Sequence, residues 1–570
     1  MNSRLLVEPA QARQTAQICL PDGRIFEAPV GTPLETYFKA IDFDLPAPII
    51  AAHVSGELRE LTYPIKADSE TRPITLADSD GFRIYCRSLA FLMITAAEEL
   101  FPEARITIEY ALNFGGLYCN VAGRSAFTPA ELARIETRMH EMVAADLPIG
   151  KERIALDEAL RYFEARGHQE KADLLKTRKK DYLILYTLGS AKDYYHGYMV
   201  PSTGYLQKFG LRPYGPSFVL QYPRRELPAI IQEPVDYPKL VAVFNEYNDW
   251  MEVMGVPNVA ALNRAEAAGR MREVILVSEA LHEQRIARIA SDMAERQPRV
   301  RLVFISGPSS SGKTTFAKRL SIQLLANGIR PVAVSLDDFL VNREDTPRDE
   351  HGEYDFESFN ALDLPLFNQV LLGLMAGEEV TMPHYDFVGG QRQAGAPLQI
   401  GRDNVIIVEG IHGLNPRLAR DITPQCIYRV YVSALTQLNI DWHNRVPTTD
   451  TRLLRRIVRD ATARGYSASD TLKRWESVRR GEKTWIFPYQ EHADVMFNSA
   501  LVYELAVLKP FAEPLLLQAK PHTREYIEAK RLLSFLEWFI PAAPDLIPDN
   551  SILREFIGGS ILQDYSPQRP

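Results

Sequence analysis

The sequence predicts an α/β protein in which a C-terminal domain with a parallel sheet follows a small β-rich module and a mixed α+β module. Three observations predict this fold class. A glycine-rich run, GPSSSGKTT, stands between an apolar stretch and a helical pattern in the second half of the chain. Two later apolar stretches end in acidic residues, as buried parallel strands do where they lead into a ligand crevice. Near the N-terminus, LPDGRIF has the pattern of a strand, a turn and a second strand.

Length and composition narrow the class of protein. The chain has 570 residues, more than one hydrophobic core usually serves, so we expect about three domains. Acidic residues outnumber lysine and arginine by 73 to 65, and the net charge of -8 argues against a general binder of nucleic acids or anionic membranes. The 4 cysteines are scattered without a C-x-x-C pair, and no apolar run has the length of a membrane span. We therefore expect a soluble, cytoplasmic protein with no membrane partner.

The first module is predicted from a hairpin and a helix start. Residues 18–27 predict two strands around an Asp-Gly turn, and residues 48–54 and 81–86 predict two further strands. The run TPLE from Thr32 predicts a helix with a capping threonine, a proline at its first position and a glutamate that completes a capping box. These elements together indicate a β-grasp fold.

The next part of the chain has a mixed α+β pattern. It contains a helical pattern at 88–100, a strand at 105–112 and a capping box that opens a helix at Thr128. Residues 224–299 hold several prolines before a helical pattern at 273–296, and they predict a linker with one connecting helix.

Both N-terminal modules resemble parts of tRNA synthetases. After a lead-in over 1–13, residues 14–86 resemble a TGS domain, which implies a docking or regulatory module without chemistry of its own. Residues 87–223 resemble the second additional domain of threonyl- and alanyl-tRNA synthetases, where two histidines of an H-x-x-x-H segment bind zinc. Arg87 and Phe91 occupy those two positions here, so we expect no zinc in this module.

The glycine-rich run matches G-x-x-x-x-G-K-[ST] without a mismatch. In this pattern backbone N–H groups face a triphosphate, the lysine reaches the β and γ phosphates, and a hydroxyl completes a Mg²⁺ shell. Residues 300–306 predict the strand before the run, and residues 315–326 predict the helix after it. We therefore expect ATP and Mg²⁺ as cofactors, with the nucleotide bound by Gly307, Pro308, Ser309, Ser310, Ser311, Gly312, Lys313, Thr314 and Thr315.

Acidic residues follow two further predicted strands. The strand at 330–336 ends at Asp337, and the strand at 404–408 ends at Glu409. In a parallel sheet both carboxylates point into the same crevice. Phosphoryl transfer to a hydroxyl needs a phosphate cradle, a metal ion and a base. The candidates for these parts are Lys313, Thr314, Glu409 and Asp337.

An arginine-rich helix is predicted over residues 450–460. Arg452, Arg456 and Arg459 fall on one of its faces, and apolar residues fall on the opposite face. Guanidinium groups pair with phosphate oxygens in fork geometry, so this face is suited to a lid over phosphates. The alternative is a solvated basic face.

The motifs GPSSSGKTT, SLDDF, YDF, PHYDF, VEGI, DTRLLRRIVRD and HAD occur in an order that resembles the uridine kinase and phosphoribulokinase family across residues 300–500. The resemblance implies a P-loop kinase domain that uses ATP and Mg²⁺ to phosphorylate a hydroxyl of a small ribose-bearing acceptor, with nucleosides favoured. It implies catalytic roles for Asp337 as general base and for Lys313, Arg456 and Arg459 at the transferred phosphate. It also implies substrate binding by Asp355 and Tyr385 and Mg²⁺ binding by Thr314 and Glu409.

Two positions depart from the family pattern. Uridine kinases have a base-reading histidine five residues after the tyrosine of the PHYDF segment, where this chain has Gly390. The tyrosine that usually closes D-x-F-Y is Leu340. We therefore expect phosphorylation without the uracil discrimination of uridine kinases.

A second functional hypothesis comes from the N-terminal modules. These modules would bind RNA or another ligand, and the P-loop domain would act as a regulatory ATPase. A GTPase is disfavoured because no [NT]-K-x-D motif follows the loop. Residues 501–570 predict a helical extension with proline breaks, and neither its role nor the oligomeric state follows from the sequence.

Overall fold

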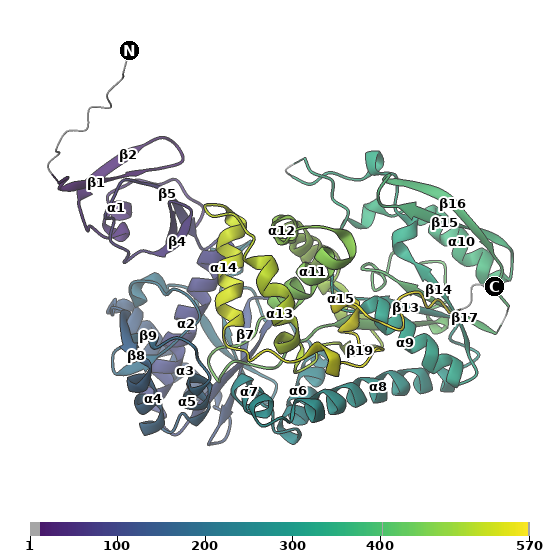
Figure 1. The fold of residues 1–570 in the computed structure, drawn as a ribbon, viewed down its shortest axis with the longest axis horizontal. Coiled ribbons are helices and arrows are strands. Elements are labelled where there is room, and N and C mark those ends of the chain that lie inside the picture. Colours follow the sequence, from purple (N-terminus) through teal and green to yellow (C-terminus); the bar gives the residue numbers. More distant parts are fainter. Residues whose placement is uncertain (1–11, 351, 402, 568–570) are drawn as a thin grey trace, which may run out of the picture.

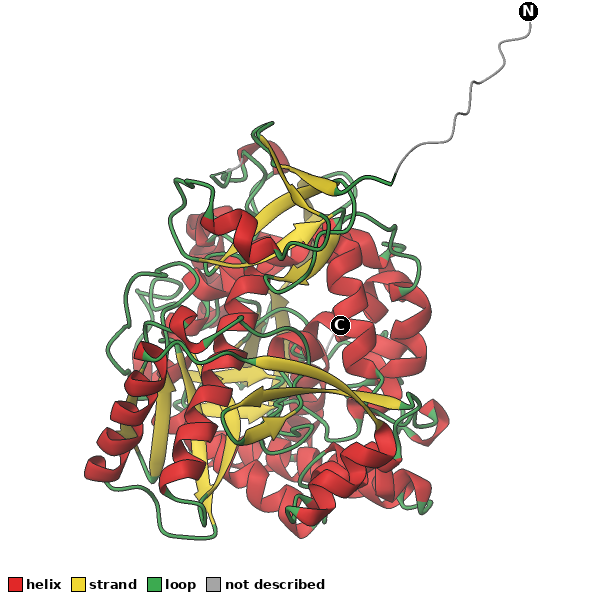
Figure 2. Ribbon diagram, turned by 90° about the vertical axis from the view of Figure 1, so that its left-hand side faces the viewer, coloured by secondary structure: helices red, strands yellow, loops and turns green. Residues whose placement is uncertain are grey.

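The computed structural model describes residues 12–350, 352–401 and 403–567, and Figures 1 and 2 show their arrangement. Two N-terminal modules lie at one end of the molecule, the P-loop domain lies at the other, and C-terminal helices pack between them (Figure 1). No helix in these ranges is long and apolar enough to cross a membrane. The predicted lead-in over residues 1–13 lies almost wholly outside the described residues.

The first module is a five-stranded mixed sheet in the order β2-β1-β5-β3-β4. The predicted hairpin is confirmed, because β1 and β2 pair antiparallel and Cys19 stands opposite Ile25 across the turn. The side chains of Ile18, Leu34 and Phe38 are buried in the small core beneath the sheet. The elements of the module are β1 (Thr15–Cys19), β2 (Ile25–Pro29), α1 (Leu34–Lys39), β3 (Ile49–Val54), β4 (Glu57–Glu60) and β5 (Ser69–Thr75).

Two local predictions in this module are wrong. Thr32 does not cap α1; its hydroxyl donates to the Pro29 carbonyl at 2.8 Å, and Pro33 precedes the first helical residue. Residues 81–86 are not a strand but lie in the first two turns of the long helix α2 (Ser79–Leu100), whose apolar residues continue at helical spacing through Leu89. The fifth strand is β5, which the sequence hides because it is largely polar and contains Pro73.

The second module packs α2 and α3 against a four-stranded sheet in the order β11-β12-β7-β6, with a three-stranded sheet beside it. The capping box at Thr128 is confirmed, because its side chain accepts from the Glu131 N–H while the Glu131 carboxylate accepts from the Thr128 N–H. The elements are β6 (Arg105–Leu112), β7 (Gly116–Ala122), α3 (Pro129–Ala144), β8 (Gly150–Ala155), α4 (Leu156–Ala165), α5 (Gln169–Lys176), β9 (Tyr182–Leu188), β10 (Ala191–Asp193), β11 (Gly210–Tyr214) and β12 (Ser217–Gln221).

The predicted linker is more ordered than expected. It contains α6 (Pro238–Val253) and α7 (Val259–Ala267) before the predicted helix α8 (Met271–Glu295). Helix α8 runs along one side of the P-loop domain (Figure 1), where the buried Arg319 of α9 pairs with Glu279 and Glu283. The prolines of this stretch misled the prediction because Pro238 stands at the first position of α6, where a proline is tolerated.

The P-loop domain is built on a five-stranded parallel sheet in the order β14-β17-β13-β18-β19. The strand before the P-loop, β13, lies at the centre and is buried on both faces. The strands are β13 (Leu302–Ser306), β14 (Arg330–Ser335), β17 (Asn404–Glu409), β18 (Ile427–Ser433) and β19 (Val495–Asn498), beside the hairpin β15 (Val380–Asp386) and β16 (Gln391–Leu398). The helices are α9 (Lys313–Ala326), α10 (Leu364–Ala376), α11 (Thr448–Arg464) and α12 (Ala468–Trp485).

The C-terminal extension contains α13 (Glu504–Leu516), α14 (Arg524–Leu536) and the short α15 (Arg554–Ile557). The prolines do not break its first helix as predicted, since Pro510 and Pro514 both lie inside α13. Pro510 has no N–H for the Ala506 carbonyl, and this carbonyl instead accepts from the Ala542 N–H at 3.1 Å. The extension is therefore folded into the body of the protein.

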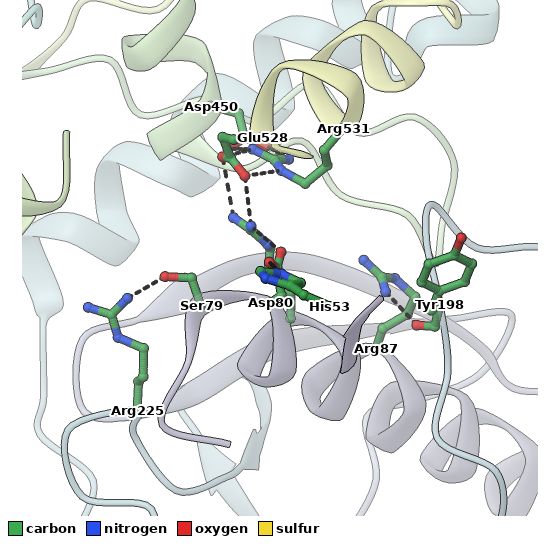
Figure 3. A network of polar contacts seen from close by, with 10 residues as sticks. His53, Ser79, Asp80, Arg87, Tyr198, Arg225, Asp450, Glu528 and Arg531 are labelled. Carbon is green, nitrogen blue, oxygen red and sulfur yellow. Dashed lines mark hydrogen bonds and ion pairs between the residues drawn. The ribbon is translucent and has the colours of Figure 1, made fainter. Parts of the chain in front are cut away.

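A chain of ion pairs connects the first module to the P-loop domain through α14 (Figure 3). His53 lies 3.4 Å from Asp80, and Arg83 of α2 bonds both Asp80 and Glu528 at 2.8 Å. Arg531 bonds Glu528 at 2.7 Å and grips Asp450 with two bonds of 2.7 and 2.8 Å. Asp450 stands in the first turn of α11, where an acidic group also stabilises the helix dipole.

Burial and the neighbouring cations shift the pKa of Glu528 in opposite directions. Burial alone would raise the pKa of Glu528, but the charges of Arg531 and Arg83 lower it to about 2. Glu528 therefore stays ionised and depends on the two arginines for compensation.

We predict that Arg531→Met destabilises the protein, because it leaves the carboxylates of Asp450 and Glu528 without their shared partner. The expected loss is about 2–4 kcal/mol in the first unfolding transition, measured as a shift of the urea midpoint. Arg270→Met is the control, since its pair with Glu273 is 50% and 61% exposed and should contribute no more than about 0.5 kcal/mol. Equal midpoints for the two variants would show that the chain of ion pairs does not hold α14 to α11.

Candidate active site

The P-loop joins the end of β13 to the start of α9. Gly307 packs so closely on β18 that an added Cβ would collide with the Val432 carbonyl oxygen, and Gly312 has a left-handed φ of 82°. Only glycine meets both demands without strain. The loop therefore closes tightly and leads directly into the N-terminus of α9, where the first N–H groups of the helix have no partner within it.

Side chains from other elements hold the carbonyl oxygens of the loop. Lys313 donates to the Pro308 carbonyl at 3.2 Å, Arg452 to the Ser309 carbonyl at 3.0 Å, and Ser499 to the Ser311 carbonyl at 2.5 Å. Because a peptide group carries its C=O and N–H on opposite sides, fixing these carbonyls turns the N–H groups the other way. The loop is therefore organised as a nest of N–H donors, which is the arrangement that binds anions.

The loop also offers hydroxyls that fit a triphosphate. The hydroxyl oxygens of Ser310 and Ser311 are buried and have no hydrogen-bond partner among the described residues. The Lys313 side chain is 8% exposed and bonds only to a neutral carbonyl, which a phosphate can replace. The predicted nucleotide-binding residues therefore lie together and fit ATP.

Thr314 and Glu409 face each other at the end of the loop. The Thr314 hydroxyl lies 3.5 Å from the Glu409 carboxylate, which ends the strand next to β13. Burial raises the pKa of Glu409 to about 7, and the charge of Lys313 opposes that shift. A hydroxyl and a poorly solvated carboxylate are oxygen ligands of the kind Mg²⁺ takes, so the two residues fit the predicted metal site.

Asp337 lies in a short 3-10 turn, Leu336–Phe339, directly after β14. Desolvation in the cleft raises its pKa, the nearby charge of Lys313 lowers it, and the neighbouring Asp338 raises it further. Asp338 has a different position, because its carboxylate accepts from the Tyr385 N–H at 3.1 Å and so holds the β15 strand. Of the two adjacent aspartates, Asp337 is therefore the one available to a reacting hydroxyl.

The predicted acceptor residues lie on two neighbouring segments. Tyr385 is 2% exposed, and its hydroxyl has no hydrogen-bond partner among the described residues. Asp355 is half-buried on the loop before α10; desolvation raises its pKa, as does the charge of Asp349, while Arg480 lowers it. The bond from the Tyr385 N–H to the Asp338 carboxylate connects the tyrosine to the turn that carries Asp337.

The arginines of α11 divide into two groups. Arg452 and Arg455 are fully buried, and they pair with the buried Glu482 of α12 and Glu504 of α13. Arg456 and Arg459 are 13% and 15% exposed; Arg456 donates to the Ser309 hydroxyl at 2.8 Å, and both arginines contact Asp460. Arg452 and Arg456 both reach Ser309 from α11, but Arg452 is buried, bound to the Ser309 carbonyl and paired with Glu482.

Sequence reasoning missed several charged residues near the site. Burial raises the pKa of Glu357, two residues after Asp355, to about 7, while the charges of Arg456 and Lys313 oppose that shift. Glu482 accepts from the Ser309 N–H at 3.2 Å as well as from Arg452. Glu555 of α15 accepts from Thr315 on the P-loop helix. Their positions depend on tertiary packing, and no local motif marks them.

Comparison with known proteins separates the two halves of the chain. Residues 302–506 match the model of the "Phosphoribulokinase / Uridine kinase family". The matched residues cover the P-loop domain, which is less than half of the chain, and this domain is similar to that family. The P-loop, the turn with Asp337 and the arginine helix all lie inside the matched residues, and the C-terminal helices α14 and α15 lie outside them.

The N-terminal part matches threonine–tRNA ligases. The ligase of Methylococcus capsulatus is 34% identical over 197 residues, covering 34% of this chain and 30% of the ligase. The ligase of Cupriavidus necator is 36% identical over 195 residues, covering 34% of this chain and 31% of the ligase. The chain therefore spans about a third of the length of these relatives.

Solved structures of kinases also match the chain. A possible uridine kinase from Bacillus stearothermophilus is 21% identical, with 38% of this chain and 97% of that one covered and a TM-score of 0.27. A D-glycerate 3-kinase from Cryptococcus neoformans is 17% identical, with 46% and 89% covered and a TM-score of 0.20.

Proposed function

We propose that the protein is an ATP- and Mg²⁺-dependent kinase that phosphorylates a hydroxyl of a small ribose-bearing acceptor in the cytoplasm, with nucleosides as the favoured class. One observation carries the proposal. The carboxylates of Glu409 and Asp337 follow two neighbouring parallel strands, and the charge of Lys313 acts on the pKa of both. A phosphate cradle, a metal site and a base thus meet in one crevice, and these are the parts that phosphoryl transfer needs.

Each residue has one role in this mechanism. Mg²⁺, held by Thr314 and Glu409, would neutralise charge on the phosphates. Lys313 leaves the Pro308 carbonyl and donates to the transferred phosphate, while Arg456 and Arg459 face the same group from α11. Asp337 accepts the proton of the attacking hydroxyl as the new phosphorus–oxygen bond forms and the bond from the transferred phosphorus to the bridging oxygen breaks, so that ADP leaves. Asp355 and the buried hydroxyl of Tyr385 orient the acceptor, so its hydroxyl stays in line for attack.

Gly390, which stands where uridine kinases have a base-reading histidine, supports a substrate specificity that differs from theirs. The Arg343 guanidinium lies across Gly390, where an added Cβ would stand 2.7 Å from the Arg343 Cζ. The Arg343 N–H donates to the Gly390 carbonyl at 2.8 Å, and its side chain donates to the Phe387 carbonyl at 2.9 Å. The charge of Arg343 also opposes the rise in pKa that burial causes at Tyr385. A cation therefore stands where an imidazole would read the base.

The N-terminal match favours a second candidate function. Threonine–tRNA ligases act on a tRNA, so the shared part supports a regulatory ATPase whose front modules bind RNA. ADP release that depends on tRNA and yields no phosphorylated acceptor would favour this candidate. ADP release tied to a phosphorylated acceptor would favour the kinase.

We predict that Lys313→Ala abolishes turnover, because the lysine neutralises charge on the transferred phosphate. Electrostatic contacts of this kind contribute roughly 3 kcal/mol or more to the transition state. The measurement is ADP formation with a nucleoside panel, and the exposed Lys473→Ala on α12 is the control with the same change. Turnover near that of the wild type in Lys313→Ala would refute the P-loop assignment.

Asp337→Asn keeps the shape of the side chain but cannot accept the proton. We expect turnover to fall by about 10²-fold or more while the affinity for ATP is unchanged, as measured by steady-state kinetics and nucleotide titration. The opposite pattern, normal turnover with weaker ATP binding, would make Asp337 a nucleotide or metal ligand. Asp338→Asn is the matched comparison, because its oxygen can still accept from the Tyr385 N–H.

We also predict weak discrimination between bases. A site that hydrogen-bonds a polar edge can reject an analogue without that edge by about 10⁴-fold, and Gly390 offers no side chain for such a bond. The test compares kcat/KM for uridine, cytidine, adenosine, guanosine and simple sugars. A strong preference for uridine would show that Arg343, or Gln391 and Arg392 beyond it, reads the base instead. Arg343→Ala would then distinguish these residues: the variant loses the preference for uridine only if Arg343 recognises the base.

A further inference from the structure

The last part of the C-terminal extension lies directly on the P-loop. Ile552, Leu553 and Phe556 are each 1% exposed or less and belong to the same core as the P-loop helix. The Ile552 side chain packs on Gly312, where an added Cβ would come 2.5 Å from its Cγ2. We call residues 551–563 the C-terminal clasp.

The clasp is fixed to both helices that frame the loop. Lys318 of α9 donates to the Leu562 and Gln563 carbonyls at 2.6 and 2.8 Å. The Arg455 guanidinium of α11 lies 5.0 Å from the centre of the Phe556 ring, and the same arginine lies 3.5 Å from the Ser310 carbonyl. The clasp therefore sits in a defined place over the loop.

Glu555 is the residue of the clasp that reaches the binding groups. One oxygen of its carboxylate accepts from the Thr315 hydroxyl at 2.7 Å and from the Thr315 N–H at 3.3 Å. Thr315 is the third residue of α9, so its N–H is one of the donors that the helix leaves free. The N–H groups at this end of a P-loop are the ones that cradle nucleotide phosphates. A carboxylate oxygen thus occupies a donor pair that is suited to a phosphate oxygen.

We propose that the C-terminal clasp is an autoinhibitory element in which Glu555 competes with a nucleotide phosphate for Thr315. The inference rests on the proposed function, since it names ATP as the competitor. Two anions cannot share one N–H and one hydroxyl at this distance, and like charges placed together repel. ATP binds fully only after the Glu555 side chain has left Thr315. The clasp stays anchored through Ile552, Leu553 and Phe556, so a rotation of the Glu555 side chain is enough.

The clasp lowers the apparent affinity for ATP, because only the molecules in which Glu555 is not bound to Thr315 can bind the nucleotide fully. It also gives the protein a route for control. The Phe556 ring rests on Arg455 of α11, and α11 is joined to the N-terminal module through Asp450 and Arg531. A change in α11 therefore reaches the carboxylate that covers Thr315.

The test measures binding of Mg²⁺–ATP and of tripolyphosphate by titration calorimetry on the full chain. Tripolyphosphate has no base or ribose, so its affinity reports the phosphate cradle alone. Glu555→Gln removes the charge, and Glu555→Ala removes the side chain. Asp564→Asn is the matched control, because Asp564 is exposed on the same stretch of chain and its charge, like that of Glu555, acts on Lys318. Thermal unfolding of each variant checks that the fold is kept.

We expect both Glu555 variants to bind both ligands about tenfold more tightly than the wild type, and Asp564→Asn to bind as the wild type does. Unchanged or weaker binding by Glu555→Ala would overturn the proposal and make Glu555 either irrelevant or a nucleotide ligand. An equal gain in Asp564→Asn would also overturn it, because the effect would then be one of net charge. If every variant binds ATP and neither Glu555 substitution changes the affinity, the kinase proposal still stands. Absence of ATP binding in every chain would refute the kinase proposal, and with it the competitor named here.

Discussion

The rest of the structure depends on how the carbonyl oxygens of the P-loop are held. A loop that binds phosphates must turn its N–H groups toward the ligand, and it can do so only if its carbonyls have partners on the other side. Arg452 of α11 and Ser499, which follows β19, supply two of those partners. Because Arg452 and Arg455 are buried, each needs a buried carboxylate, which Glu482 and Glu504 provide. The backbone at Ser309 and Ser311 is therefore held by side chains from elements much later in the chain.

This constraint explains why the C-terminal extension is folded into the protein rather than appended to it. Glu504 opens α13, so the charge that compensates Arg455 comes from the extension itself. Helix α14 then supplies Arg531, which grips the first turn of α11 and reaches the N-terminal module through Glu528 and Arg83. The helix that supports the P-loop is thus held in its first turn by Arg531, which lies outside the matched residues 302–506, and near its middle by Glu504, which lies at the end of them.

The sequence was most informative where a short run of residues determines the local structure by itself. The P-loop, the carboxylates after β14 and β17 and the capping box at Thr128 are all local, and the structure places each of these elements where the pattern predicts it. The strand expected at 81–86 was wrong because apolar residues in a short window fit either period, and only the continuation through Leu89 identifies the helix. Glu482 and Glu555 could not be predicted at all. Their contacts with Ser309 and Thr315 cross more than 170 residues of sequence, and an isolated glutamate in a polar stretch has no signature.

The contacts that occupy the P-loop differ in how easily a nucleotide can replace them. Lys313 bonds to a neutral carbonyl, and such a bond contributes about 0.5–1.5 kcal/mol, so the stronger bond to a phosphate displaces it readily. Arg456 bonds to the Ser309 hydroxyl, which is also a neutral partner. Two contacts involve carboxylates: Glu482 accepts from the Ser309 N–H, and Glu555 accepts from the Thr315 N–H and hydroxyl. Bonds to charged groups contribute about 1.5–3 kcal/mol. The neutral contacts are therefore displaced most easily as the triphosphate enters. Glu482 stays paired with the buried Arg452, and in our proposal the release of Glu555 from Thr315 limits the affinity for ATP.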